Sequence, residues 1–245
     1  LYGDANAKLE VLSCATREQI EELPEYVQNT NITVQHIEQG HVFDLEIHVY
    51  YEQEHASVRI VDTHTNIVQI EKNWQVIFED KTTSLELKAD HSALIMKQIW
   101  DFSQTVDIDD VKEILDRQIT CNMAIANEGI HNSYGANIGH VILNMDSDCV
   151  KTKAKAYAAA GSDARMNGCE LPVVINSGSG NQGITCCVPV VVYAKELDCT
   201  QEQLYRALVL SNLTAIYIKT GIGTLSAFCG AVSAGAAAGA GIAYL

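Results

Sequence analysis

The distribution of apolar and polar residues divides the chain into two parts with different periods. In the first part, apolar and polar residues alternate over several short runs; Leu45, Ile47 and Val49, for example, are separated by charged or imidazole side chains. A period of two is typical of a β-strand with one buried and one solvated face. The pattern predicts strands joined by short polar breaks into a mainly antiparallel sheet, at residues 32–38, 42–50, 56–62, 66–71 and 75–79.

Helices are predicted where capping signals precede apolar residues at helical spacing. Thr16 and Thr200 each stand three residues before a glutamine, which is the spacing of a capping box. The helices that they begin should extend to about Val27 and Lys219. Asp107 can cap a third helix, whose expected apolar stripe consists of Val111, Ile114, Leu115, Ile119 and Met123.

From about residue 101 onward the pattern is helical almost throughout. We therefore predict an α+β protein, with a sheet domain flanked by helices at residues 1–100 and a mostly α-helical domain at residues 101–245. Charge supports this division, because residues 1–150 contain 26 acidic and 9 basic side chains, whereas residues 151–245 contain 5 and 7. Clustered Lys and Arg are lacking, which argues against nucleic acid as a partner.

The last segment, residues 222–245, contains no charged residue. Ala, Gly and Ser dominate it and contribute little to transfer into lipid, so we expect a central helix packed through small residues rather than a membrane span. Eight cysteines without a close CxxC pair, in a chain without a secretion signal, indicate reduced thiols and a cytoplasmic protein. Cys121, Cys186 and Cys187 are interpreted as small hydrophobes.

Candidate chemistry is concentrated in the segment NSGSGNQG, residues 176–183, which lies between two apolar runs. Its glycines allow a ligand to approach the backbone, and the side chains of Ser177, Ser179, Asn181 and Gln182 can donate and accept hydrogen bonds. The segment is suited to binding a small zwitterion or anion. The alternative interpretation is an ordinary glycine-rich connection between two core helices.

Two other polar groups of the sheet region admit alternative interpretations. His36, His41, His48 and His55 show no compact ligand spacing, and we interpret them as surface or loop histidines rather than a metal site. The segment DTHTN, residues 62–66, places polar side chains, including His64 and Asn66, at a strand break. These side chains could point into a cleft or simply hold a turn.

Several of these segments together resemble a known family. SDARMNG, NSGSGNQG, FCGA (residues 228–231), DTHTNIV (residues 62–68) and LEVLSCATREQIEEL (residues 9–23) are similar to the L-cysteine desulfidase family, which is related to the catalytic subunit of iron-sulfur L-serine dehydratases. The resemblance extends over nearly all of the chain. It implies a 4Fe-4S cluster held by three cysteines, with one iron open to substrate, and it assigns the first cluster ligand to Cys229.

The resemblance also implies that the chain is truncated at both ends. It begins at Leu1 without Met and stops inside an apolar run. The family's other two cluster cysteines would lie beyond Leu245, and its catalytic cysteine upstream of Leu1. A single thiolate cannot hold the cluster, so we expect this fragment alone to be inactive.

The activity that the resemblance implies is that of a carbon-sulfur lyase: α,β-elimination of L-cysteine to sulfide, ammonia and pyruvate. Ser177, Ser179 and Asn181 would bind the substrate, with Arg165 as a carboxylate anchor or as a partner of Asp163 or a helix end. Lys219 is a candidate second base, or a lysine at a helix end. L-Serine as substrate, a pyridoxal-phosphate eliminase and a non-catalytic small-molecule binding protein remain alternatives, and a homodimer is the ordinary expectation.

Overall fold

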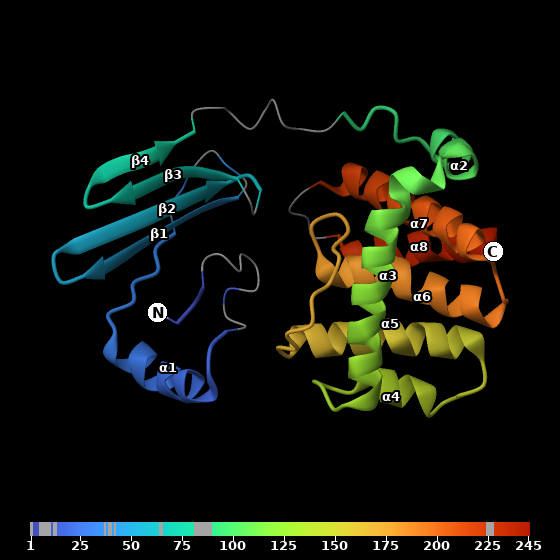
Figure 1. The fold of residues 1–245 in the computed structure, drawn as a ribbon, viewed down its shortest axis with the longest axis horizontal. Coiled ribbons are helices and arrows are strands. Elements are labelled where there is room, and N and C mark those ends of the chain that lie inside the picture. The colour runs from blue at the N-terminus through green and yellow to red at the C-terminus, as the bar shows by residue number, and fades with distance from the viewer. Residues whose placement is uncertain are drawn as a thin grey trace. The chain divides into compact units, whose positions relative to one another are not determined.

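A computed structural model describes residues 2–4, 11, 14–36, 38, 41, 43–63, 66–80, 90–223 and 228–245. The chain divides into two compact units, Leu1–Asp90 and His91–Leu245. The first contains helix α1 and a four-stranded antiparallel sheet, and the second contains helices α2 to α8 (Figure 1). This arrangement confirms the predicted α+β class.

Helix α1, Arg17–Asn29, begins where its capping signal places it. The Thr16 hydroxyl accepts from the Gln19 backbone N–H, and the Gln19 side chain accepts from the Thr16 N–H at 2.9 Å. The capping box is therefore formed, and the helix ends two residues beyond the predicted Val27.

The sheet is a simple meander with the strand order β1-β2-β3-β4. Asn73 and Trp74 both have positive φ, which is the geometry of a tight hairpin turn, and they connect the last two strands. A predicted strand at residues 32–38 is wrong, because residues 31–36 form no regular structure and Val34 is 92% exposed. The observed strands are β1 Asp44–Tyr51, β2 Glu54–Val61, β3 Ile67–Lys72 and β4 Gln75–Glu79.

The burial of the sheet differs from the expectation of one buried apolar face. Leu45, Ile47 and Val49 alternate as predicted but are 43–58% exposed. His55, in contrast, is buried, because its ring stacks on Trp74 at a centroid distance of 4.1 Å and its Nε2 lies 3.0 Å from Nδ1 of His48. The interpretation of His55 as a surface histidine is therefore wrong.

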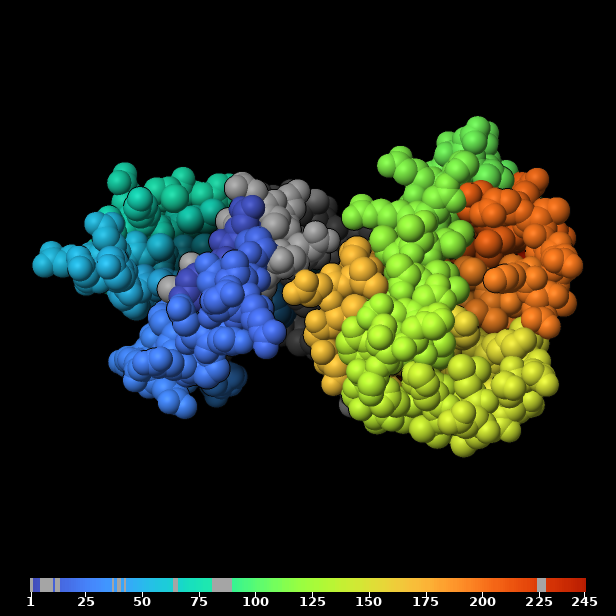
Figure 2. Space-filling model, turned by 60° about the horizontal axis from the view of Figure 1, so that its bottom comes forward, coloured from blue at the N-terminus to red at the C-terminus, as the bar shows by residue number. Residues whose placement is uncertain are grey.

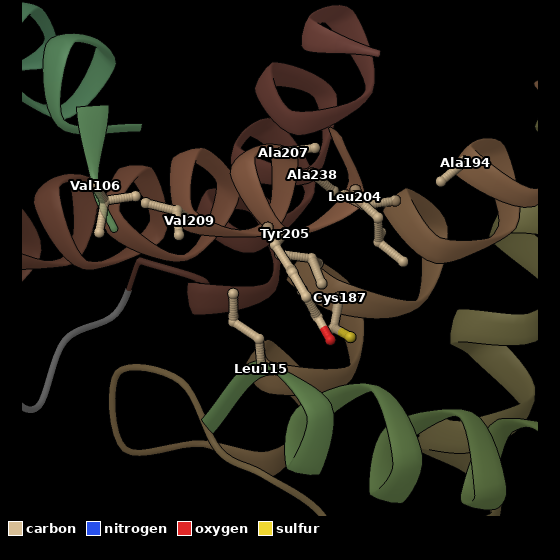
Figure 3. Close-up of a cluster of buried hydrophobic side chains, with 11 residues drawn as sticks. Val106, Leu115, Cys187, Ala194, Leu204, Tyr205, Ala207, Val209 and Ala238 are labelled. Carbon is tan, nitrogen blue, oxygen red and sulfur yellow. The ribbon is translucent and has the colours of Figure 1, made fainter. Parts of the chain in front are cut away.

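The second unit is a helical bundle whose largest buried cluster combines residues from α3, α6, α7 and α8. Figure 3 shows Leu115 of α3, Cys187 of α6, Tyr205 of α7 and Ala238 of α8 in this cluster. The helices are α2 Met96–Thr105, α3 Ile108–His131, α4 Ile138–Leu143, α5 Val150–Met166, α6 Gly180–Glu196, α7 Gln201–Ile222 and α8 Gly230–Tyr244.

The buried face of α3 contains four residues of the expected apolar stripe, Val111, Leu115, Ile119 and Met123, but it also contains two amides. Ile114 is 62% exposed, whereas Gln118 and Asn122 are buried beside Leu115 and Ile125. Polar side chains can occupy a core when their hydrogen bonds are satisfied. Both amides form such hydrogen bonds, and their partners belong to the candidate site or contact it.

Helix α8 packs against α6 and α7 on one face only. Its buried residues are Ser233, Ala234, Ala237, Ala238 and Gly241, so the expectation of a centrally packed helix holds for that face alone. Among the residues that the structure describes, no helix has both the length and the apolarity required to cross a membrane.

The paired cysteines of α6 lie in the interior, as predicted. Cys186 and Cys187 are fully buried, and burial raises the pKa of the Cys186 thiol to about 12. These thiols therefore remain protonated at neutral pH and act as packing residues.

Candidate functional site

The glycine-rich segment forms a tight turn immediately before α6. Asn176 and Ser179 exchange two backbone hydrogen bonds of 3.2 and 3.1 Å, and Ser177 and Gly178 between them both have positive φ. These are the features of a two-residue type I′ turn. The loop that contains it, residues 167–179, lies at the surface of the helical unit, in gold in Figure 2.

Buried and half-buried amide side chains from two other helices anchor this turn. Asn122 of α3 donates to the Val174 carbonyl and accepts from its N–H, at 3.1 and 2.8 Å. Asn176 donates to Oδ1 of Asn212 at 2.9 Å, and Asn212 exchanges two 2.8 Å hydrogen bonds with Gln118. These hydrogen bonds therefore hold the residues just before the turn, 174–176, against α3 and α7.

The sequence pattern did not identify these anchoring amides. Gln118 and Asn122 lie four residues apart within an otherwise apolar helix face, and this spacing is the signal that could have identified them. Asn176 belongs to the motif NSGSGNQG but was assigned no role there. Its side chain also accepts a 2.7 Å hydrogen bond from the Ser177 hydroxyl.

The beginning of α6 presents hydrogen-bond donors. Ser179 is the N-cap, but its side chain makes no capping hydrogen bond to the first turn. The N–H groups of residues 180–182 precede the first intrahelical bond, which Gly183 donates to the Ser179 carbonyl at 3.0 Å. Free N–H groups and the positive end of the helix dipole favour binding of an anion such as a carboxylate.

Arg165 adds a positive charge to the same place. Its guanidinium donates to Oδ1 of Asn181 at 3.2 Å, and a Cβ at Gly180 would lie only 2.3 Å from Arg165 Nε. The guanidinium therefore lies across the first turn of α6, where only glycine leaves room for it. Asp163, the alternative partner, accepts instead from the Ile138 backbone N–H at 2.8 Å.

Gln182 connects the glycine-rich segment to the second predicted motif. The residue is 8% exposed, and its Oε1 has no hydrogen-bond partner among the described residues. A Cβ at Gly230 would lie 2.3 Å from Gln182 Nε2, so the amide packs directly on the backbone of Gly230. The structure thus brings NSGSGNQG and FCGA together, with Gln182 packed against the residue that follows Cys229, the exposed N-cap of α8.

The remaining predicted residues are distributed over both units. Lys219 is half-buried in the last turn of α7. Asn66 belongs to the sheet unit, where its side chain donates to the Val61 carbonyl at 3.0 Å and closes the turn between β2 and β3. His64 lies outside the described residues.

The residues described here do not by themselves fit an iron-sulfur cluster. Such clusters are held by three or four ligands, most often thiolates. In the described part of the chain, no group of three or more His, Cys, Asp or Glu side chains is arranged to hold a metal ion. Cys229 offers one exposed thiol at the beginning of α8.

The fold is that of an α+β protein. Its candidate site combines a serine- and glycine-rich turn before α6 with the first residue of α8, which packs against the Gln182 side chain of α6. A family model described as serine dehydratase alpha chain matches residues 6–245. The chain belongs to this family, which confirms the resemblance at family level.

Similar proteins are found in several bacteria. A UPF0597 protein of Desulfitobacterium hafniense is 48% identical over 100% of this chain and 57% of its own length. UPF0597 proteins of Lachnoclostridium phytofermentans and Finegoldia magna are 48% and 46% identical over 99% of this chain and 58% of their own lengths. The chain thus spans somewhat more than half the length of these relatives. No solved structure matches it.

Proposed function

We propose that the intact protein is an L-cysteine desulfidase that removes sulfide from L-cysteine by α,β-elimination. The observation that carries this proposal is the meeting of the two motifs, in which Gln182 packs on Gly230 next to Cys229 while Arg165 lies across the start of α6. This arrangement offers a carboxylate anchor, amide acceptors and a thiol within one region, as an amino-acid substrate requires.

In this proposal the substrate carboxylate binds at the first turn of α6. The N–H groups of residues 180–182 and the hydroxyl of Ser179 donate to it, and Arg165 supplies the opposite charge. The Ser177 hydroxyl already donates to Asn176, so its oxygen is left to accept from the substrate's ammonium group. Because Asn181 Oδ1 already accepts from Arg165, its Nδ2 is directed to the substrate. The unpaired Oε1 of Gln182 is an acceptor for the substrate's ammonium group.

The elimination removes the α-proton and breaks the Cβ–S bond, so sulfide leaves and 2-aminoacrylate forms. Addition of water to its imine tautomer releases ammonia and leaves pyruvate. Lys219 is the candidate base within this chain, and a cysteine outside it is the stronger candidate for taking the α-proton. In the intact protein, a 4Fe-4S cluster with Cys229 as one ligand would supply Lewis-acid chemistry, with its other ligands outside the described residues.

L-Serine is the second candidate substrate, because the matching family model is described as serine dehydratase. Both amino acids present the same carboxylate and ammonium groups to the first turn of α6. They differ only in the leaving group, and the described residues offer no contact that would distinguish a thiol from a hydroxyl.

The test is anaerobic purification of the full-length gene product, with measurement of iron, acid-labile sulfide, and product release from L-cysteine and L-serine in parallel. We expect about four iron atoms per chain and sulfide release from L-cysteine. Replacing Cys229 with alanine should abolish both, whereas replacing Cys14, an exposed cysteine of the sheet unit, should leave both unchanged.

Two results would contradict the proposal in different ways. A full-length protein that stays metal-free and inactive after cluster reconstitution would favour the non-catalytic binding protein. Pyruvate release from L-serine without sulfide release from L-cysteine would retain the lyase but transfer the substrate assignment to serine.

A further inference from the structure

Helix α8 has an exposed face without a single charged side chain. Residues 220–245 contain no Asp, Glu, Lys or Arg. Phe228 precedes the helix and is 73% exposed, and Val232 in its first turn is exposed to the same extent. Together with the exposed Ala231, Gly235, Gly239 and Ala243 they form what we call the α8 outer face.

The spacing on this face is that of a close helix contact. Ala231, Gly235, Gly239 and Ala243 recur every four residues and therefore form one ridge of small side chains along the helix. Small residues in such a row allow the backbone of a second helix to approach closely.

The glycines of the two faces differ in their surroundings. On the inner face, a Cβ at Gly241 would lie 2.9 Å from the Ala207 carbonyl oxygen, so close packing on α7 explains that glycine. A Cβ at Gly235 or Gly239 would meet no atom within 4 Å. Glycine inside a helix reduces its stability relative to alanine. Nothing among the described residues explains why glycine occupies the two outer positions.

A groove runs beside the outer face between the end of α7 and the beginning of α8. Its volume is about 330 Å³, and it is lined by Ile218, Ile222, Phe228, Cys229, Val232, Ser233 and Ala236. Exposed apolar surface of this kind, without charges, is characteristic of a contact with another polypeptide segment. Because the lining offers no charge and no free sheet edge, an apolar helix fits it better than a charged segment or a strand.

The relatives contain polypeptide outside the part that matches this chain. In each of the three relatives described above, the match to this chain covers 57–58% of the relative's length, so about two fifths of that length lies outside the match. We propose that, in the full-length protein, an apolar helix from that additional part packs across Gly235 and Gly239 and fills the α7–α8 groove. This contact covers Cys229 from one side, and it does not depend on the activity proposed above.

The first test replaces Gly239 with leucine in the full-length protein and measures the midpoint of thermal unfolding. If α8 is covered as proposed, leucine overpacks the contact and the midpoint should fall by roughly 3–8 °C. If the outer face is open, the sign reverses, because leucine has a higher helix propensity than glycine and the midpoint should stay or rise. Gly239→Ala, a smaller change, should give a smaller fall if the leucine variant does not fold.

Gly221→Leu is the matched control. Gly221 is an exposed glycine of α7 at which a Cβ would also meet no atom within 4 Å, and it does not line the groove. Its midpoint should stay or rise. Equal falls for Gly221→Leu and Gly239→Leu, or no fall for Gly239→Leu, would overturn the proposal.

The second test identifies what covers the face. A photo-crosslinking phenylalanine analogue is placed at Val232 in the full-length protein, and the crosslinked peptides are identified by mass spectrometry. Crosslinks to peptides outside these 245 residues support the proposal. Crosslinks confined to these residues, or a dimer that Gly239→Leu converts to a monomer, would assign the face to an internal contact or a second copy and overturn it.

Discussion

Replacing Asn212 with alanine tests whether the buried amides hold the turn before α6. Asn212 donates to Gln118 Oε1 and accepts from Gln118 Nε2, both at 2.8 Å, and it accepts from Asn176 Nδ2 at 2.9 Å. Gln118 and Asn176 are 3% and 6% exposed, so water cannot readily replace the lost partner.

The expected cost follows from the groups left behind. Gln118 Oε1 loses its only hydrogen bond among the described residues, and Gln118 Nε2 keeps only a 3.9 Å contact to the Cys186 sulfur, so two buried groups lose a strong partner. Asn176 Nδ2 retains a longer hydrogen bond to the Asn212 carbonyl at 3.3 Å. Each buried polar group left unpaired costs about 1–3 kcal/mol. We therefore expect the free energy of unfolding to fall by about 2–5 kcal/mol, a large part of the roughly 5–15 kcal/mol typical of a folded protein.

The assay is denaturant unfolding of the full-length protein, with Asn144→Ala as the control. Asn144 is an exposed asparagine at the end of α4, and its replacement should change stability by less than about 0.5 kcal/mol. Hydrogen exchange adds a local readout: the Ser179 amide, which donates to the Asn176 carbonyl, should exchange at least tenfold faster, a change of about 1.4 kcal/mol in local opening. A loss below about 1 kcal/mol with unchanged exchange at Ser179 would refute the positioning role.

One further prediction concerns the contact between the two motifs of the helical unit, and another concerns an ion pair within the sheet. Gly230→Ala places a Cβ 2.3 Å from Gln182 Nε2 and should lower activity of the full-length protein on its substrate by roughly a hundredfold, whereas Gly221→Ala should not; equal activities would contradict the placement of Gln182. The hydrogen bond from Arg59 lowers the pKa of Asp44, so the pair stabilises the sheet above the ordinary aspartate pKa of about 3.9 and loses this contribution as the pH falls through the lowered value. Acid unfolding of Asp44→Asn should lack that component, and an unchanged acid transition would show that the pair contributes nothing.

Local signals in the sequence were sufficient to place most secondary structure. The capping residues Thr16, Asp107 and Thr200 each precede a helix, because a cap is formed by hydrogen bonds that span only two or three residues. Strand β4, residues Gln75–Glu79, has the predicted bounds, and the bounds of β1 to β3 differ from prediction by at most two residues. The failure at residues 32–38 has a physical reason, since an alternating pattern forms a strand only when a neighbouring strand pairs with it.

The sequence by itself determined the class of fold, the caps, the two motifs and the family to which they belong. Only the tertiary structure placed Gln182 on Gly230, 48 positions later in the chain, and joined Gln118, Asn176 and Asn212 into one chain of amides. Periodicity reports whether a residue faces the interior, but it does not report which partner lies there. A buried amide is tolerated only when a particular distant group satisfies it, and that pairing is decided when α3, α6, α7 and α8 pack together.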